Sequence, residues 1–310
     1  MPGVDVVSPT WLELMDISGN VKVKIDPGYI TWARSRGYQI WALLANDFKN
    51  PEKTRQFLHD PNARDELIRQ VLAVSALYGL DGINIDFENV YKADRDALSQ
   101  FVRELTPFLH AQGLIVSMDV NIPEGSENWS QCYDHQALGR IVDYLVLMTY
   151  DQYYASGNKA GSVAEITWVE ENALKVLEMV PRQKLLLGVP FYTRVWDDRD
   201  KHIGVIGMDR MQEILQEYPV HKVWDSQSGQ YKITYEKDGS TRIFWMEDLQ
   251  SMDLKSALVL KLDLAGIASW NRADGTEAVW PLLNRNLKLL QGYMQWSPIM
   301  EDAGPGEVRE

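Results

Sequence analysis

The chain has 310 residues, of which 45% are hydrophobic and 24% charged, which is ordinary for a soluble globular protein. Its formal net charge of −13 argues against binding to nucleic acids and to anionic membranes, because nothing here would neutralise their phosphates. No run of about 20 apolar residues occurs, so no membrane span is predicted. Cys132 is the single cysteine, which excludes an intrachain disulfide. The N-terminus lacks the basic and apolar regions of a signal peptide.

Short apolar runs alternate with segments of helical periodicity along most of the chain. Seven runs are typical of strands: 4–7, 40–45, 82–87, 114–120, 144–149, 185–189 and 267–270. Helical patterns cover 63–78, 94–111, 164–180 and 276–290, with Asn62 as the expected N-cap of the first and Gly79 as its stop. Alternating strands and helices predict an α/β fold with a parallel sheet, and at this length a (β/α)₈ TIM barrel.

Two irregularities modify the predicted barrel. Seven strands are recognised where a barrel has eight, which leaves open that the first barrel strand is absent from this chain. Residues 231–235 and 241–245 flank a Gly-containing turn and predict a hairpin. We therefore expect a barrel of residues 1–190 and 261–296, a small α+β insertion of residues 191–260 between strands 7 and 8, and a disordered acidic tail of residues 297–310.

The run from Asp81 to Glu88 carries acids where a buried strand should be apolar. Alternation places Asn84, Asp86 and Glu88 on one face and the apolar side chains on the other. Paired carboxyl groups on a rigid strand suit acid-assisted bond cleavage. Salt bridges at a strand end are an equally good explanation from this run alone. A metal site is disfavoured, because calcium loops use glycine-bearing turns rather than an alternating strand.

Polar or aromatic residues also stand near the ends of the other predicted strands, where barrel enzymes carry their active sites. They are Trp11, Asn46, Asp47, Asn121, Tyr150, Asp151, Tyr192, Trp270 and Asn271. Most of the eleven tryptophans are expected in the core, and a few are expected to stack on sugar rings. For Trp11 the two alternatives are equally good, whereas Trp41 and Trp129 are more consistent with packing.

Four ordered motifs carry a resemblance to glycoside hydrolase family 18, the chitinase-like family. Residues 81–88 resemble its D-G-x-D-x-D-x-E signature, residues 148–151 its M-x-Y-D motif, and residues 188–194 its G-x-P-F-Y-G-R motif. Trp270 matches its eighth-strand tryptophan, and residues 191–260 its insertion domain. Within the family, Ser8-Pro9-Thr10-Trp11 and Asn84 are most similar to the bacterial spore-cortex and cell-wall N-acetylglucosaminidase branch.

The resemblance implies a retaining, substrate-assisted mechanism. Glu88 is the implied general acid and base, Asp86 orients the acetamido N–H, and Tyr150 hydrogen-bonds the acetamido oxygen. Trp270 lies under the sugar, and Asp151 and Tyr192 contact the substrate. Asn84, Trp11 and Met148 complete the implied substrate-binding set, and Asp81 is implied as structural support.

Some positions depart from the family pattern. Asn84 replaces the usual middle Asp, and its amide is expected to hydrogen-bond and support Asp86 but cannot take its proton. Phe87 replaces the common Trp or Tyr, with outer-face packing as the expected consequence. Residues 42–47 lack the usual S-x-G-G, and residues 270–275 differ from W-x-L-G. None of these changes removes Glu88.

We therefore predict a glycosidase that acts on a β-1,4-linked GlcNAc-containing glycan, either peptidoglycan of the wall or spore cortex or chitin. No cofactor or metal is expected, and a monomer is expected. The expected location is extracellular, at the cell envelope or on the spore, as a domain of a longer bacterial protein. The alternatives are a carbohydrate-binding lectin without turnover, and a glycosidase in which two carboxylates act in the ordinary retaining way.

Overall fold

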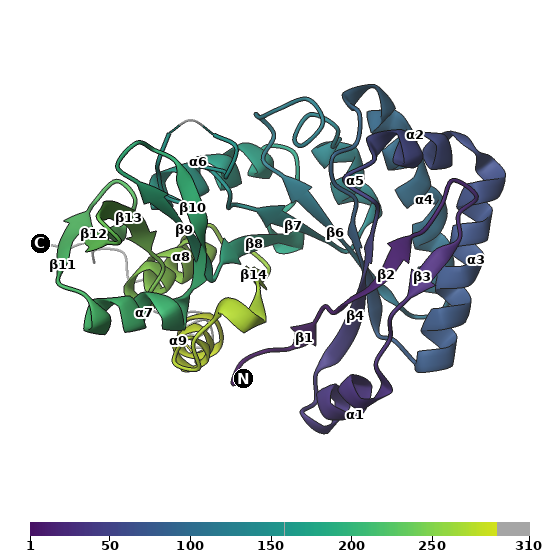
Figure 1. The fold of residues 1–310 in the computed structure, drawn as a ribbon. Coiled ribbons are helices and arrows are strands. Elements are labelled where there is room, and N and C mark those ends of the chain that lie inside the picture. The colour runs from purple at the N-terminus through teal and green to yellow at the C-terminus, as the bar shows by residue number, and fades with distance from the viewer. Residues whose placement is uncertain (158, 290–310) are drawn as a thin grey trace, which may run out of the picture.

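The computed structural model describes residues 1–157 and 159–289. Its larger part is a curved, mostly parallel sheet with helices on its outer side, as in a TIM barrel (Figure 1). The strands are β1 (Val6–Val7), β2 (Thr10–Leu14), β3 (Val21–Val23), β4 (Gln39–Ala45), β5 (Gly82–Asp86), β6 (Ile115–Asn121), β7 (Tyr144–Met148), β8 (Leu185–Pro190) and β14 (Gly266–Trp270). All seven predicted strands are therefore confirmed.

The sheet does not close between its first and last parallel strands. The strand order is β14-β8-β7-β6-β5-β4-β2-β3, and β1 and β2 both pair with β4 as one interrupted strand. In the described part of the chain, β14 pairs only with β8. Side chains connect the N-terminal part of the chain to the part that follows β14. Lys288 pairs with Asp5 at 2.5 Å, and the Arg272 guanidinium lies 4.9 Å from the ring centroid of Trp32.

The outer helices are α1 (Pro27–Ser35), α2 (Pro51–His59), α3 (Pro61–Tyr78), α4 (Arg95–Ala111), α5 (His135–Ile141), α6 (Ile166–Leu177), α8 (Leu249–Lys261) and α9 (Val279–Asn284), with a π-helical turn at Arg285–Leu289. The four predicted helices are confirmed. For α3, Gly79 ends the helix with φ 59°, as predicted, but the N-cap is Asp60, whose side chain accepts from the N–H of Asn62. The prediction of Asn62 as the cap was wrong because Pro61 extends the helix into its first turn.

A separate antiparallel sheet lies between β8 and β14, to the left of the barrel in Figure 1. Its order is β10-β9-β13-β12-β11, formed by β9 (Tyr192–Asp197), β10 (His202–Gly207), β11 (Val220–Asp225), β12 (Gln230–Lys237) and β13 (Ser240–Met246), with α7 (Met208–Glu217) packed on one face. β12 and β13 are the predicted hairpin, and its turn residues Asp238 and Gly239 both have positive φ. The insertion between strands 7 and 8 is therefore confirmed. Its boundaries stay a prediction, because α8 packs against α6 and α9 of the barrel. The predicted tail lies outside the described residues.

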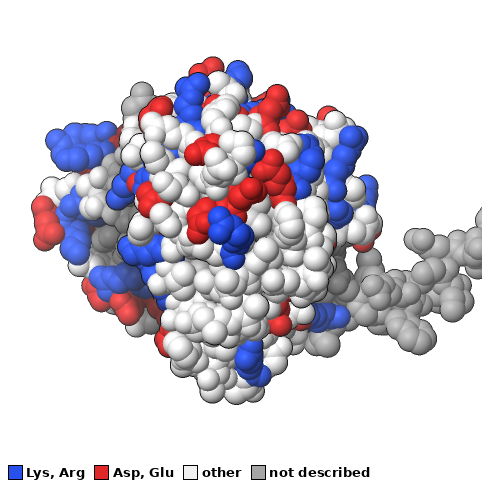
Figure 2. Space-filling view, turned by 90° about the vertical axis from the view of Figure 1, so that its right-hand side faces the viewer, with Lys and Arg blue, Asp and Glu red and all other residues white. Residues whose placement is uncertain are grey.

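Acidic and basic side chains are interspersed over the upper part of the face that carries α3, and its lower part is mostly uncharged (Figure 2). The face in this view carries no continuous basic stripe of the kind that follows a nucleic-acid backbone. Within residues 1–157 and 159–289, no helix has both the length and the apolarity needed to cross a bilayer.

Candidate active site

The end of β5 places Glu88 at the carboxyl end of the barrel strands. The preceding Phe87 is buried on the outer face, with its ring 5.3 Å from Phe101 of α4 and 6.2 Å from Phe57 of α2. This contact confirms the outer-face packing predicted for Phe87. Because side chains alternate along an extended chain, anchoring Phe87 outside directs Asp86 and Glu88 inward.

Asn46, which follows β4, fixes the backbone of Glu88 from the neighbouring strand. Its Nδ2 donates to the carbonyl oxygen of Glu88 at 2.8 Å, and its Oδ1 accepts from the Glu88 N–H at 2.9 Å. The Asn46 amide also donates to the buried Oγ1 of Thr54 at 2.9 Å. The hydroxyl of Tyr133 donates to the carbonyl oxygen of Phe87 at 2.9 Å. The two bonds between Asn46 and Glu88 and the bond from Tyr133 hold the backbone of residues 87–88 after the ladder of β5 has ended, and the bond to Thr54 fixes the Asn46 amide.

Asp86 at the end of β5 and Glu88 just beyond it have different pKa values, so the two groups are in different protonation states at neutral pH. Burial, together with the charges of Asp86 and Asp151, raises the pKa of Glu88 to about 8. Burial raises the pKa of Asp86 to about 6. No cation in the described part of the chain counteracts either shift. At neutral pH, Glu88 is therefore mainly protonated and Asp86 mainly ionised, which is the division of roles between an acid and a charge stabiliser.

Asn84 hydrogen-bonds a third carboxyl group rather than Asp86. Its Nδ2 donates to Asp119 Oδ2 at 2.7 Å, and its Oδ1 accepts from the hydroxyl of Ser117 at 2.7 Å. Burial, followed by the charge of Asp86, raises the pKa of Asp119 well above its usual range. Asp119 was not among the predicted site residues, although an acid inside the apolar run 114–120 is the same signal that marked Asp86.

The ends of β7 and β8 bring together the other predicted site residues. The hydroxyl of Tyr192 and the Nη2 of Arg194 both donate to Asp151 Oδ1 at 2.7 Å, and Asp151 has a φ of 57°. The ring centroids of Tyr150 and Tyr192 are 6.4 Å apart. Burial raises the pKa of Tyr150 well above its usual range, so Tyr150 stays a hydrogen-bond donor. Arg194 was not among the predicted site residues, although it lies within the motif of residues 188–194.

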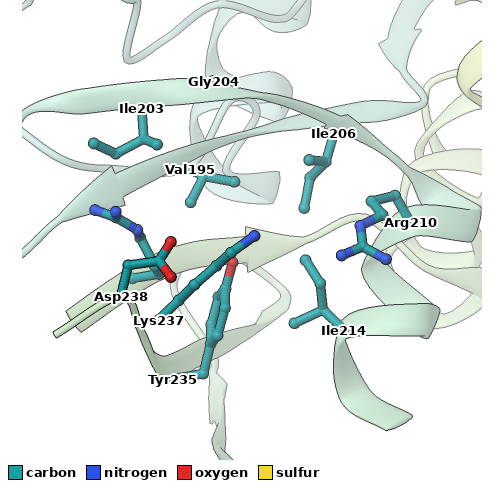
Figure 3. A pocket seen from close by; sticks show the side chains of 10 residues that line it. Val195, Ile203, Gly204, Ile206, Arg210, Ile214, Tyr235, Lys237 and Asp238 are labelled. Atoms are coloured by element: carbon teal, nitrogen blue, oxygen red, sulfur yellow. The ribbon is translucent and has the colours of Figure 1, made fainter. Parts of the chain in front are cut away.

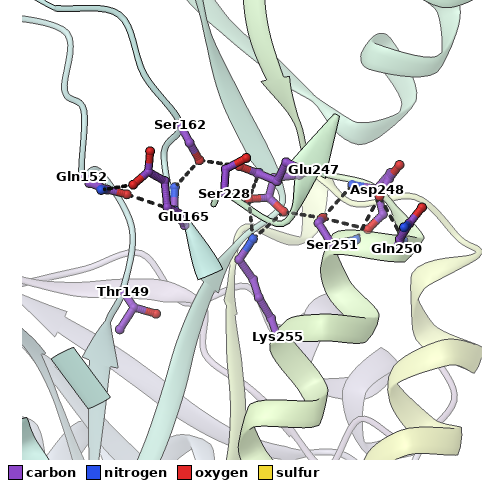
Figure 4. A network of polar contacts seen from close by, with 12 residues as sticks. Thr149, Gln152, Ser162, Glu165, Ser228, Glu247, Asp248, Gln250, Ser251 and Lys255 are labelled. Atoms are coloured by element: carbon purple, nitrogen blue, oxygen red, sulfur yellow. Dashed lines mark hydrogen bonds and ion pairs between the residues drawn. The ribbon is translucent and has the colours of Figure 1, made fainter. Parts of the chain in front are cut away.

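A buried polar network fixes the segment that follows Tyr150 and Asp151 (Figure 4). In this segment, Gln152 Nε2 donates to Glu165 at 2.8 Å, and the hydroxyl of Ser162 donates to Gln230 of β12. Gln230 Nε2 donates to Glu247 at 2.7 Å, and Glu247 forms a fully buried ion pair with Lys255 of α8 at 2.8 Å. The network therefore joins this segment to both the insertion and the barrel.

The remaining predicted residues differ in exposure. Trp270 ends β14 with 42% of its surface exposed, whereas Trp11 is 7% exposed and packs edge-on against Tyr29 at 5.5 Å. Met148 is buried at the end of β7. Asp81 lies at the opposite end of β5 from Glu88, where its Oδ2 accepts from the N–H of Ile40 at 2.8 Å. The substrate-binding roles of these tryptophans and of Met148 stay predictions.

The insertion has a pocket of about 270 Å³ between its sheet and α7 (Figure 3). Val195, Ile203, Tyr235 and Arg242 are among its lining residues. Alternation along β9 turns Val195 away from the face on which Arg194 reaches Asp151, so the pocket is not part of the acid cluster. In the described residues, no group of three His, Cys, Asp or Glu side chains is arranged to hold a metal ion.

Comparisons with known proteins agree with this geometry. The sequence profile described as "Glycosyl hydrolases family 18" matches residues 46–274. The chain is 23% identical over 270 residues to the "Uncharacterized glycosylase YvbX" of Bacillus subtilis, an alignment that covers 84% of this chain and 78% of that protein. It is 25% identical over 268 residues to a "Cortical fragment-lytic enzyme" of the same organism, with 80% of this chain and 59% of that protein covered.

Among solved structures, a chitinase from Chromobacterium violaceum superposes with a TM-score of 0.84 at 25% identity. The superposition covers 92% of both chains. The chain therefore has the fold of a chitinase over most of its length, including the antiparallel insertion.

Proposed function

Because this chain belongs to glycosyl hydrolase family 18, we propose that it cleaves β-1,4-linked N-acetylglucosamine-containing glycans with retention of configuration, through an oxazolinium intermediate. The observation that carries the proposal is the pairing of Glu88 and Asp86 at the end of one strand, with no cation among the described side chains acting on either group. Glu88 is positioned by Asn46 and has a pKa of about 8, beside an acid with a pKa of about 6.

In the proposed first step, protonated Glu88 gives its proton to the glycosidic oxygen as the bond to the anomeric carbon breaks. The substrate's own acetamido oxygen attacks that carbon, so no carboxylate of the protein becomes covalently attached. Asp86 accepts from the acetamido N–H and stabilises the positive charge of the oxazolinium ring. Tyr150 donates to the acetamido oxygen and orients it for attack.

In the second step, Glu88 is ionised and takes a proton from the water that opens the oxazolinium ring. Trp270 provides the apolar surface under the sugar, and Asp151 with Tyr192 binds its polar groups. Both Asp151 partners donate to one oxygen, Oδ1, which keeps the carboxylate in a single orientation.

The proposed substrate is glycan of the bacterial wall or spore cortex, or chitin, and the proposed location is the cell envelope or the spore. The support is the similarity to a protein named for lysis of cortical fragments and to a chitinase fold.

The test is incubation of the wild-type protein and the Glu88→Gln variant with wall fragments and GlcNAc oligomers. We expect the variant to lose about 10²- to 10⁴-fold in kcat, the usual contribution of a positioned general acid. Equal product from both proteins would contradict the assignment of Glu88. Inhibition of the wild type by a thiazoline mimic of the oxazolinium tests substrate assistance, and failure of the mimic to bind would favour an ordinary carboxylate nucleophile.

A further inference from the structure

Asp119 lies beside Asp86 in the register of the sheet. Asn84 pairs with Ser117, and Ile85 with Met118, so the next residues along the parallel strands β5 and β6 are Asp86 and Asp119. Neighbouring strands are about 4.8 Å apart, and residues at matching positions point to the same face. The two acids are therefore cross-strand neighbours inside the barrel.

Among the described strands, Asp119 is also the only titratable cross-strand neighbour of Asp86. On the other side of β5, Asp86 pairs with Ala45 of β4, which has no polar side-chain group. Asp86 Oδ1 is shielded from solvent, and no donor among the described side chains lies within hydrogen-bond distance of it. An ionised Asp119 cannot supply a donor, whereas a protonated Asp119 can.

The groups around this pair favour retention of a proton. Four titratable side chains interact electrostatically with Asp119: Asp86, Glu88, Tyr133 and Tyr150. All are acids, and no cation is among them. Adjacent buried carboxyl groups without a cation cannot both ionise easily, so one of them keeps a proton. Asp119 is the more deeply buried of the two.

Asn84 cannot hold that proton, and its hydrogen bonds direct it to Asp119. Ser117 occupies the amide oxygen of Asn84, and the amide nitrogen donates to Asp119 Oδ2. One carboxyl oxygen of Asp119 therefore accepts from Asn84, which leaves the other to carry the proton toward Asp86.

We propose that Asp119 is a positioning residue of the glycosidase centre: its carboxyl group stays protonated, accepts from Asn84 and donates to Asp86, and so keeps Asp86 oriented and ionised. The role in catalysis rests on the function proposed above. The protonation of Asp119 does not, because it can be measured without substrate.

The first experiment records infrared spectra of the substrate-free protein at neutral pH, with ¹³C-labelled aspartate to separate Asp119 from Glu88. We expect the wild type to show the carbonyl band of a protonated aspartic acid that is missing in Asp119→Asn. Absence of this difference would overturn the proposal. Asp96→Asn, at an exposed position on α4, is the control for the same substitution away from the site and should keep the band.

The second experiment compares Asp119→Asn with Asp119→Ala in steady-state kinetics against pH. An asparagine can accept from Asn84 and donate to Asp86, so Asp119→Asn should keep kcat close to that of the wild type. Asp119→Ala should lose roughly 10- to 100-fold in kcat with little change in KM, as for loss of other supporting hydrogen bonds. The acidic limb of its pH–rate profile should move to higher pH. The pKa of Asp86 rises when its ionised form loses a hydrogen-bond donor.

Two outcomes separate the possible failures. If both variants move the alkaline limb of the pH–rate profile to lower pH by the same amount and leave the acidic limb unchanged, Asp119 is ionised and its charge raises the pKa of Glu88. The proposal is then wrong. If the wild type cleaves none of the glycans, the proposed function fails, and the infrared band still decides whether Asp119 is protonated.

Discussion

The acids at the end of β5 have no cation beside them in the described part of the chain, and this decides how they titrate. An acid beside an arginine has a lowered pKa and serves as a permanent charge. Here burial raises both values, and the charges of Asp86 and Asp151 raise that of Glu88 further, so that the pKa is about 8 for Glu88 and about 6 for Asp86. Between pH about 6 and pH about 8, Glu88 is therefore mainly a protonated donor and Asp86 mainly an anion.

This separation predicts a bell-shaped pH dependence of kcat/KM. Activity requires ionised Asp86 and protonated Glu88, so it should fall below pH about 6 and above pH about 8. In Asp86→Asn the residual activity should have its alkaline limb at lower pH, because the charge that raises the pKa of Glu88 is gone. The measurement is the pH–rate profile of both proteins, and an unchanged alkaline limb in the variant would count against this coupling.

The same pKa shift predicts a pH-dependent effect of Glu88→Gln on stability. A carboxyl group with a raised folded-state pKa is stabilising below its unfolded value of about 4.5, and its contribution is lost as the pH rises toward 8. The variant should therefore gain stability relative to the wild type between pH 5 and pH 9, by on the order of 2 kcal/mol or more. Thermal unfolding at both pH values checks this, and a constant difference in Tm would contradict it.

At the scale of elements, the position of Glu88 depends on a contact between two strand ends. Glu88 lies two residues beyond the end of β5, and its backbone would be free to move without the amide of Asn46. The usual S-x-G-G of the family is absent at 42–47, and in this chain Asn46 ties the end of β4 to the acid.

Asn46→Ala should therefore reduce kcat more than it changes KM. We expect a loss of roughly 10- to 100-fold in kcat, as for other residues that orient a catalytic group. The unpaired backbone groups of Glu88 should cost about 1–3 kcal/mol in the free energy of unfolding. Thr54→Val, which removes only the hydroxyl contacted by Asn46, is the matched control and should have the smaller kinetic effect.

Element types were predictable because their signals are local. Period-two and helical patterns located seven strands and four helices, and the turn chemistry of residues 237–240 located the hairpin of β12 and β13. Short elements such as α1 and α5 were missed, because nine or seven residues carry too few apolar positions to establish a period.

At the scale of the whole molecule, one buried ion pair connects three parts of the chain. Glu247 follows β13 of the insertion, Lys255 is on α8, and Gln230 links both to the segment that follows Asp151 (Figure 4). Buried pairs of this kind contribute little net stability, but loss of one partner leaves an uncompensated charge.

Lys255→Met should therefore destabilise the protein by about 3–5 kcal/mol. The double variant Glu247→Leu with Lys255→Met should recover part of this loss, because no lone charge remains buried. Thermal unfolding of both variants is the measurement, and a double variant no more stable than Lys255→Met would contradict the argument. If the network also orients Asp151, both variants should lower activity at temperatures where they remain folded.

The sequence by itself determined the barrel, the insertion and the acids of β5, because periodicity, turn residues and an acid in an apolar strand are properties of neighbouring positions. It also indicated the chemistry expected of Glu88. Only the tertiary structure placed Asp119 beside Asp86, brought Asn46 to Glu88 and paired Glu247 with Lys255. The first two contacts depend on which strands become neighbours and in what register, and the buried pair depends on how α8 packs under the insertion; packing of the whole molecule settles both, rather than any local pattern.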